Sequence, residues 1–346
     1  MKALVKYDAG PGNMEIRDIP EPKPGPGQVK IEVKKAGICG SDLHILHSDI
    51  AIPVKPPVVT GHEFSGVVSE VGEGVTKYKP GDRVVSETAF HYCGKCDYCR
   101  MGYYNICVER KTLGYWYDGI FTNYTVVPEG RVHLMPENVS FLEAAMTEPL
   151  ACVVHAVYDC CRITAGDVVL VVGPGAIGQM AAQVAKAQGG VVIVSGTNID
   201  EDRLRLAKEL GADYAINVQK ESLEDLVNSI TGGYGADVVL ECSGNARGVD
   251  SGLQNIKKRG YYCQIGLCGK KIEFDIERIN YKEIHFSGSI GSRGQSWDRT
   301  LQLMSMKKVN LAPLASKEYT ILEWEEAFRA FENKEGYKIM LNPAEL

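Results

Sequence analysis

The sequence predicts an α/β protein with two domains, a β-rich first domain and a second domain built on a doubly wound parallel sheet. The chain has 346 residues, which is too long for one ordinary hydrophobic core. Short alternating strand patterns, separated by proline and glycine, continue to about Pro136. From Asp167 onward, continuous apolar strands alternate with helical patterns, which is typical of a parallel sheet covered on both faces.

The first domain is expected to consist mainly of strands. QVKIEVKKAG and EFSGVVSEVG alternate apolar and polar residues, and GDRVVSE, IFTNYTVVP and RVHLMP continue this pattern. Ser140 and Glu143 form a capping box, which predicts a helix that continues through EPLACVVHAVYDC. We place the first domain at residues 1–150 and the second at 151–291.

The second domain is expected to alternate strands and helices. After the strand DVVLVVG come AIGQMAAQVAKAQG, VVIVSG, DEDRLRLAKELG, YAINV, SLEDLVNSITG, ADVVLECSG, a helix to Lys258, and YYCQIGL. HFSGSIG is predicted as the sixth strand. The helix WDRTLQLMSMKK, a helix with the capping box of Thr320 and Glu323, and the strand YKIMLNP follow.

Composition excludes several functions. The net charge of −6 and the pI of about 5.7 argue against a nucleic-acid partner. Met1 leads directly into a strand pattern, so we expect no signal segment, and glycines and a proline interrupt the apolar run 168–185, so we expect no membrane span. Several of the eleven cysteines are clustered at metal-binding spacing in a long chain, which favours a reducing, cytoplasmic compartment.

The glycine motif GPGAIG predicts a dinucleotide site, because it follows an apolar strand and opens a helix. Gly173 permits the tight turn, Gly175 lets a pyrophosphate approach the backbone, and Gly178 lets helix and strand pack closely. The helix N-terminus then faces the phosphates. The predicted pyrophosphate-binding residues are Gly173, Gly175, Ala176, Ile177 and Gly178.

The carboxylate that usually binds the ribose is missing at the end of the next strand, where the chain reads Ser-Gly-Thr197-Asn198. Such a loop leaves room for a 2′-phosphate, and Arg203 could pair with it. We therefore predict contacts from Thr197, Asn198 and Arg203, and slightly favour NADP over NAD. The alternative is that Asp200 binds the ribose hydroxyls and Arg203 lies on a solvated helix face.

Two groups of residues have the composition of zinc sites. The first is a four-thiolate lobe that suits a closed, structural zinc ion and consists of Cys93, Cys96, Cys99 and Cys107. The second mixes thiol, imidazole and carboxylate, which suits an open, catalytic zinc ion, and consists of Cys39, His62, Glu63 and Glu148. Taken singly, Cys39 or His62 is more often a packed residue, but the glycine motif reverses these odds.

At this point the chain clearly resembles the zinc-dependent medium-chain dehydrogenase/reductase superfamily over essentially its whole length. GICGSDLH, GHEFSGVVSEVG, the cysteine lobe, TEPL and GPGAIG occur in the family's order. GSDLH, GHE, TEPL and GYKIML look most like polyol dehydrogenases, whereas SETAF followed by CGKC also looks like threonine dehydrogenases. The resemblance implies a GroES-like catalytic domain, completed by about residues 292–346, and a Rossmann domain.

The resemblance also implies roles for individual residues. Cys39 and His62 match catalytic zinc ligands, and Glu63 matches an acid that binds the metal in some states. Glu148 stands where alcohol dehydrogenases have a second cysteine and polyol dehydrogenases have a glutamate. Ser41 and His44 match the proton relay. The chain departs from animal sorbitol dehydrogenases by keeping all four lobe cysteines, and near SIGSRGQSW it lacks their Phe-Arg-Tyr substrate motif.

We predict a zinc- and NAD(P)-dependent dehydrogenase of a secondary alcohol, with a polyol or sugar derivative as substrate. Zinc on the alcohol oxygen would lower the pKa of the hydroxyl, and the nicotinamide would accept the hydride. L-Threonine 3-dehydrogenase activity and a non-catalytic NAD(P)-binding role are the alternatives. We expect a small-molecule alcohol or ketone as the partner, no nucleic acid, no membrane, and a homodimer or homotetramer.

Overall fold

The computed structural model describes residues 1–343, and these divide into two compact units. Of these residues, the first unit comprises 1–149, 292–305 and 311–343, and the second comprises 150–291 and 306–310. The α/β prediction is confirmed, because the first unit is rich in antiparallel strands and the second holds a parallel sheet. Within residues 1–343, no helix combines the length and the hydrophobicity that spanning a bilayer requires.

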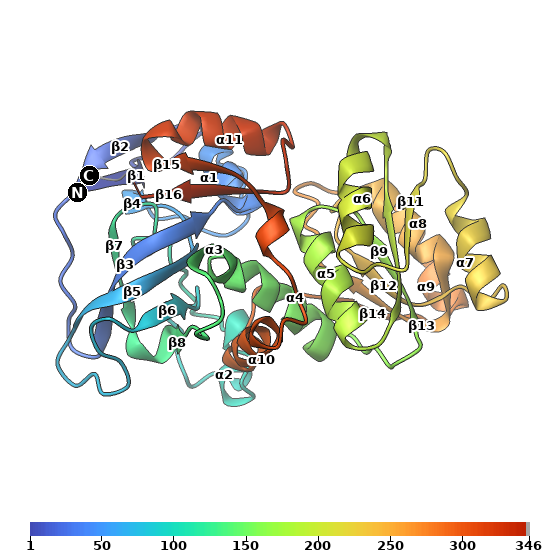
Figure 1. The fold of residues 1–346 in the computed structure, drawn as a ribbon, viewed down its shortest axis with the longest axis horizontal. Coiled ribbons are helices and arrows are strands. Elements are labelled where there is room, and N and C mark those ends of the chain that lie inside the picture. The colour runs from blue at the N-terminus through green and yellow to red at the C-terminus, as the bar shows by residue number, and fades with distance from the viewer. Residues whose placement is uncertain (344–346) are drawn as a thin grey trace. The chain divides into compact units, whose positions relative to one another are not determined.

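The first unit contains two sheets (Figure 1). The seven-stranded sheet has the order β15-β16-β3-β5-β6-β8, with β7 paired to β3. Its strands are β3 (Gln28–Gly37), β5 (Glu63–Val71), β6 (Arg83–Ser86), β7 (Tyr124–Pro128), β8 (Val132–Leu134), β15 (Ala315–Thr320) and β16 (Lys338–Asn342). The three-stranded sheet consists of β2 (Met14–Asp18), β1 (Lys2–Lys6) and β4 (Val58–Val59).

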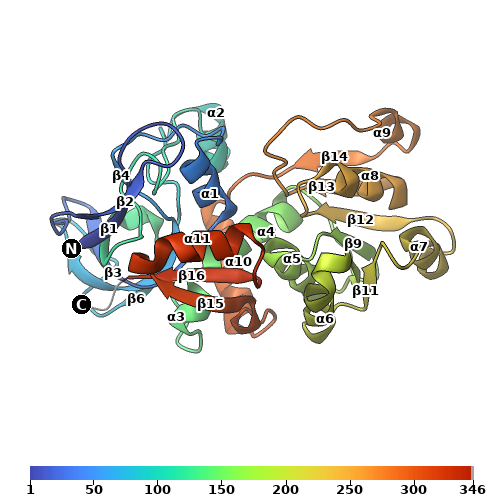
Figure 2. The same cartoon turned by 90° about the horizontal axis from the view of Figure 1, so that it is seen from above.

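Helices and one buried cluster complete this unit. The helices are α1 (Gly40–His47), α2 (Asp97–Arg100), α3 (Phe141–Ala144), the start of α4 (Thr147–Asp159), α10 (Gly294–Ser305) and α11 (Trp324–Glu332). Figure 2 shows α11 beside β15 and β16, with which it makes contacts. Ile31, Phe64, Phe121 and Phe328 belong to the core, which therefore joins the N-terminal strands to the C-terminal helix.

The second unit is a six-stranded sheet whose neighbouring strands are all parallel, in the order β11-β10-β9-β12-β13-β14. The strands are β9 (Val168–Val172), β10 (Val191–Gly196), β11 (Tyr214–Asn217), β12 (Ala236–Glu241), β13 (Ile256–Gln264) and β14 (His285–Gly288). The helices are α5 (Ala176–Ala187), α6 (Glu201–Glu209), α7 (Leu223–Thr231), α8 (Ala246–Asn255) and α9 (Glu277–Tyr281). Figure 1 shows α5 and α6 on one side of the sheet and α8 on the other.

The strand order identifies where this sheet can bind a ligand. The chain starts at β9, adds β10 and β11 on one side, and then returns to add β12 on the other side of β9. The connections reverse direction at the carboxyl end of β9, and such a switch point leaves a crevice outside the strand ends. The glycine motif follows β9 directly, so it lies at this switch point.

Two predicted helices have other bounds in the structure, and one helix was not predicted. The helix expected to end at Lys258 ends at Asn255, because Ile256 already pairs with Ala236 as the first residue of β13. The capping box at Ser140 does open a helix, but this helix ends at Ala144, and α4 starts separately at Thr147. The sequence reading also missed α1, which has the weak amphipathic pattern of a helix of only eight residues.

Candidate functional site

Cys39, His62 and Glu63 come together because two neighbouring strands bring them to the same place. β3 ends at Gly37, which pairs with Glu63 at the start of β5, so Cys39 lies next to His62. The possible ligand atoms of the three residues all lie within 4.8 Å of one another. A left-handed glycine, Gly61, precedes His62 with φ +87°, and a Cβ there would lie 2.7 Å from the Phe121 ring.

The acidic groups in and around this cluster stabilise a positive charge on His62. The Cys39 backbone N–H donates to Asp42 Oδ2 at 2.9 Å, and Asp42 Oδ1 lies 3.8 Å from His62 Nδ1. Burial raises the pKa of the Asp42 carboxyl to about 6, against the opposing effect of His62. Burial lowers the pKa of His62, but Cys39, Asp42 and Glu148 outweigh it and raise the pKa to about 10.

The residues of the cluster fit a zinc ion. A thiol, an imidazole and a carboxylate are ligands that zinc accepts, and His62 and Glu63 are 5% and 1% exposed. Within residues 1–343, the buried atoms Ser41 Oγ and His62 Nδ1 have no hydrogen-bond partner. Buried polar atoms are rarely left unpaired, so their concentration beside this cluster is what a site for a further group would produce.

Glu148 and Lys338 flank the cluster. Glu148, in the first turn of α4, is 8% exposed and lies outside the group of three, although its charge raises the pKa of His62. The Lys338 ammonium pairs with Glu63 Oε2. The sequence reading missed both Lys338 and Asp42. A lysine in the apolar strand KIMLN was the signal for Lys338, whereas the short segment GSDLH gave no comparable signal for Asp42.

The four lobe cysteines also lie together. The possible ligand atoms of Cys93, Cys96, Cys99 and Cys107 all lie within 4.8 Å of one another. Backbone N–H groups point at the sulfurs, with Cys93 N 3.3 Å from Cys107 Sγ and Cys96 N 3.3 Å from Cys93 Sγ. The backbone N–H of Cys99 lowers the pKa of the Cys96 thiol to about 6. The donors to Cys93, Cys96 and Cys107 stabilise thiolates, which are the form that binds zinc, whereas burial raises the pKa of Cys99 to about 12.

The proposed relay residues lie on one helix. Ser41 and His44 are three residues apart on α1, so they share a face. The Ser41 hydroxyl oxygen is buried, whereas the His44 side chain is 38% exposed. His44 Nδ1 lies 2.8 Å from Asp49 Oδ1. Because a carboxylate only accepts, Nδ1 is the donor and Nε2 can accept a proton.

The three motif glycines have distinct environments. Gly173 has φ +95°, and a Cβ there would lie 2.8–2.9 Å from atoms of Ser243. Gly178 passes so close to Gly173 that a Cβ would meet its carbonyl oxygen at 1.9 Å. Gly175 caps α5 and has nothing within 4 Å of its Cβ position, so its backbone is open to a ligand. Ala176 and Ile177 form the first turn of α5, as a pyrophosphate site requires.

The polar and charged side chains of the loop after β10 form hydrogen bonds with one another and with neighbouring residues. Asp200 Oδ2 accepts from the Thr197 backbone N–H at 3.0 Å and from the Thr197 hydroxyl at 2.9 Å. Arg203 Nη1 donates to Asp200 Oδ1 at 3.2 Å, and Asn198 Oδ1 accepts from Asn217 at 2.9 Å. The Asp200 carboxylate therefore organises the loop and is already bonded to three donors.

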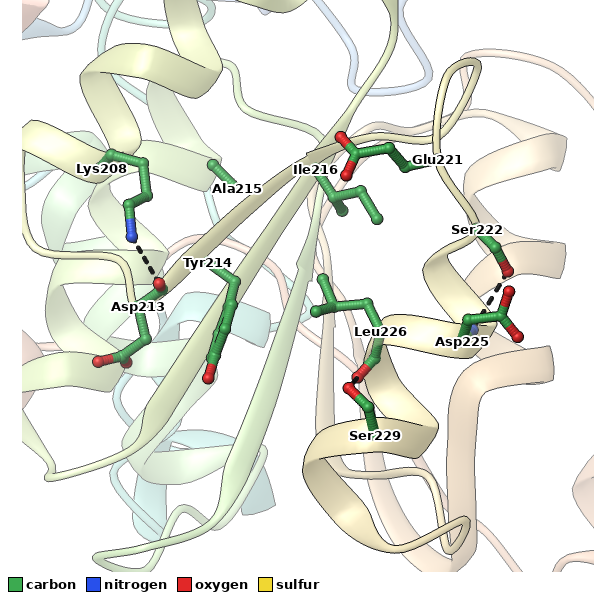
Figure 3. A pocket seen from close by; sticks show the side chains of 10 residues that line it. All are labelled: Lys208, Asp213, Tyr214, Ala215, Ile216, Glu221, Ser222, Asp225, Leu226 and Ser229. Carbon is green, nitrogen blue, oxygen red and sulfur yellow. Dashed lines mark hydrogen bonds between the residues drawn. The ribbon is translucent and has the colours of Figure 1, made fainter.

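The second unit also has an open hollow of about 590 Å³ beside the edge strand β11 (Figure 3). Several polar groups that line this hollow form hydrogen bonds with one another. Lys208 Nζ donates to the Asp213 carbonyl at 2.5 Å, and Ser222 Oγ accepts from the Asp225 backbone at 3.2 Å. None of its lining residues belongs to the glycine motif or to the loop after β10, so it is not the predicted cofactor site.

Comparison with known proteins places both units in known families. Residues 25–137 match the model of the alcohol dehydrogenase GroES-like domain, and residues 176–306 match that of the zinc-binding dehydrogenase. The chain is 48% identical to a sorbitol dehydrogenase of Halalkalibacterium halodurans, covering 99% of each. It is 41% identical to D-arabitol-phosphate dehydrogenase of Enterococcus avium, covering 100% of this chain and 99% of that one. A zinc-binding dehydrogenase structure from Sinorhizobium meliloti 1021, bound to NADP, has a TM-score of 0.88 at 31% identity and 99% coverage of each.

Proposed function

Because the chain belongs to the zinc-dependent medium-chain dehydrogenase/reductase superfamily, we propose that it oxidises a secondary hydroxyl of a polyol or sugar derivative. The observation that carries the chemistry is the buried cluster of Cys39, His62 and Glu63. The polyol substrate rests on similarity to a sorbitol dehydrogenase and to an arabitol-phosphate dehydrogenase. The reaction is a hydride transfer to NAD(P).

Cys39, His62 and Glu148 are the proposed ligands of the catalytic zinc ion, and Glu63 is the acid beside it. Glu63 already neutralises the ammonium of Lys338, so it is less available as a permanent ligand than Glu148 is. When bound, zinc supplies a Lewis acid that lowers the pKa of the substrate hydroxyl. Glu148→Gln should therefore weaken zinc binding more than Glu63→Gln does, as measured by competition with a chelator.

Ser41 and His44 are the proposed path for the substrate proton. The buried hydroxyl of Ser41 would accept the substrate proton while it passes its own proton on, and the exposed imidazole of His44 would deliver a proton to water. Asp49 accepts a hydrogen bond from His44 Nδ1 and so leaves the Nε2 lone pair to accept the proton. The four lobe cysteines would hold a second zinc ion, which would fix the loop 93–107 and take no part in the reaction.

The nicotinamide cofactor is proposed to bind at the turn of Gly173, Gly175 and Gly178, where it supplies the hydride acceptor. NADP is the proposed preference. No carboxylate stands at Gly196, and Asp200 already accepts two hydrogen bonds from Thr197. Thr197 and Asn198 would then border the 2′-phosphate, and Arg203 would turn from Asp200 to pair with it.

The substrate experiment is a screen at full zinc occupancy. Polyols, polyol phosphates, sugar acids and L-threonine are each tested with NAD and with NADP. The highest kcat/KM should fall on a polyol or its phosphate. L-Threonine as the best substrate would establish the alternative, because SETAF and CGKC also resemble threonine dehydrogenases. No turnover of any compound by cofactor-bound protein would favour the non-catalytic role.

The protein is also proposed to act in the cytoplasm as a homodimer or homotetramer. None of the eleven cysteines forms a disulfide, as a reducing compartment would ensure. The edge strand β14 carries Phe286, which is 41% exposed, and Tyr281 just before this strand is 77% exposed. Packing of this edge against a second copy of the chain would cover the exposed aromatic side chains and the unpaired backbone groups of β14. Light scattering coupled to size-exclusion chromatography measures the state.

A further inference from the structure

A cysteine, a histidine and an aspartate are linked by two hydrogen bonds at the end of α4. Cys160 Sγ is 3.6 Å from His155 Nε2, and His155 Nδ1 is 2.8 Å from Asp159 Oδ2. His155 and Asp159 are four residues apart on the helix, and Cys160 is the residue after its end. The His155 and Asp159 side chains are 3% and 10% exposed, whereas Cys160 is partly exposed.

We propose that Cys160 is a reactive thiol, activated by His155 and Asp159, and that it is modified by low-molecular-weight disulfides. The arrangement has the three parts of an activated nucleophile, which are a thiol, a base, and a group that orients the base. The thiol and the carboxylate contact different ring nitrogens, so the histidine bridges them. This site goes beyond the dehydrogenase function and does not depend on it.

The hydrogen bonds fix the direction of proton transfer. The Asp159 carboxylate accepts, so His155 Nδ1 carries the proton and Nε2 presents a lone pair to the Cys160 thiol. The bond to Asp159 holds the imidazole so that Nε2 faces the thiol and can take its proton. A thiolate results, which is the nucleophilic form of cysteine.

The exchange needs no reagent other than the disulfide. The Cys160 thiolate attacks one sulfur of the disulfide and forms a new S–S bond, while the original S–S bond breaks. The other half leaves as a thiolate and takes the proton from the His155 imidazolium. Cys160 is oxidised, and the disulfide is reduced to one thiol. A reducing agent reverses the modification.

Neighbouring thiols provide internal controls. Cys161 follows directly, and burial raises the pKa of its thiol to about 12. Cys263, on β13, lies close enough to Cys160 to interact with it electrostatically, and burial raises the pKa of the Cys263 thiol to about 11. Both thiols are therefore protonated near neutral pH and should react slowly. Asp167 is a further charge near Cys161, but the carboxylate bonded to His155 is Asp159.

The test is limited alkylation of the zinc-loaded full chain with iodoacetamide at pH 7, followed by digestion and fragment-ion mass spectrometry. Cys160 should react at least about tenfold faster than Cys161. Asp159→Asn should slow the Cys160 reaction severalfold, whereas Cys161→Ser should leave it unchanged. Oxidised glutathione should then add one glutathionyl group to the wild type at Cys160, and Cys160→Ser should accept none there.

Asp159→Asn separates activation from mere exposure, because it keeps Cys160 in place and removes only the charge that orients His155. Circular dichroism establishes that this variant is folded, and His155→Gln provides a second variant that lacks the base. Equal alkylation rates at Cys160 and Cys161 would overturn the proposal, and so would an unchanged Cys160 rate in folded Asp159→Asn. Labelling needs no turnover, so this outcome is distinct from a failure of the dehydrogenase assignment.

Discussion

The Lys338 ammonium contacts the Glu63 carboxylate inside the first unit, where the two side chains are only 5% and 1% exposed. Lys338 Nζ also donates to the Ile38 carbonyl at 2.8 Å. Burial lowers the pKa of Lys338, but Glu63 and Cys39 outweigh this effect and raise the pKa above its usual value, so the lysine stays charged. A strand near the C-terminus thus supplies the counter-charge for an acid of the candidate metal cluster.

Lys338→Met should destabilise the protein by about 3–5 kcal/mol, because it leaves the Glu63 carboxylate buried without its partner. Urea unfolding at pH 7 measures the change. The matched control is Lys317→Met, which breaks the ion pair with Glu335, where the side chains are 39% and 45% exposed. That change should cost less than about 1 kcal/mol.

The double variant Lys338→Met/Glu63→Gln shows whether the pair itself is responsible. It removes both charges, so it should be more stable than Lys338→Met alone. If the double variant is instead less stable by the sum of the two single effects, the ion pair is not the cause of the loss. The zinc content of each variant is measured in parallel, because Glu63 belongs to the metal cluster.

Zinc content separates the two proposed metal sites. The wild type should hold about two zinc ions per chain, and both Cys39→Ser and Cys107→Ser should reduce this to about one. Cys39→Ser should abolish turnover while the thermal midpoint changes little. Cys107→Ser should lower the thermal midpoint strongly, because the lobe zinc holds its loop together.

Cys268→Ser is the control for these two variants, since Cys268 belongs to neither cluster. Elemental analysis should find its zinc content equal to that of the wild type. A wild-type content below about one zinc per chain in fully active protein would contradict the metal mechanism. Loss of both metals from Cys107→Ser would show that the lobe supports the catalytic cluster as well.

Much of the fold could be predicted from the sequence because local patterns determine it. The strand DVVLVVG and the helix after GPGAIG gave their elements directly, since buried parallel strands and glycine turns have distinctive sequences. The cysteine spacing likewise identified a cluster whose members are close in the chain. In these cases the information lies within a few residues.

Contacts between distant parts of the chain could not be predicted in this way. The pairing of Lys338 with Glu63 depends on β16 joining β3, and no local pattern specifies that pairing. The buried Asp42 looks like an ordinary polar residue of a short loop until α1 places it between Cys39 and His62. The internal bonding of Asp200 and Arg203 depends on the exact turn after β10.

His44→Gln should lower kcat most at acidic to neutral pH, where release of the substrate proton to water needs a base most. The KM for the cofactor should change little, because His44 is proposed only to carry the proton. The effect on kcat should be about 10- to 100-fold at its largest. Steady-state rates between pH 6 and 10 measure it.

His47→Gln is the matched control, because His47 lies on the same helix and bonds Glu332 through Nε2 at 3.1 Å. Its side chain is 45% exposed, similar to the 38% of His44. Its pH–rate profile should follow that of the wild type. If His44→Gln also follows the wild type, the relay does not pass through this histidine.

The cofactor preference can be tested at Arg203, whose guanidinium is proposed to pair with the 2′-phosphate of NADP. Arg203→Gln should lower kcat/KM for NADP by about tenfold or more and change that for NAD much less, because only NADP carries the phosphate. Arg205→Gln is the control. Arg205 lies on the same helix, pairs with Asp202 at 2.7 Å and is 67% exposed.

An aspartate at Gly196 would be a less direct test, because a Cβ there would lie 2.9 Å from Pro174 and 3.1 Å from Asp200. Titration of the wild type with both cofactors comes first. A strong preference of the wild type for NAD would mean that Asp200 gives up its bonds to Thr197 and binds the ribose, with Arg203 retained as its partner. In that case Asp200→Asn, and not Arg203→Gln, should change the ratio of the two kcat/KM values.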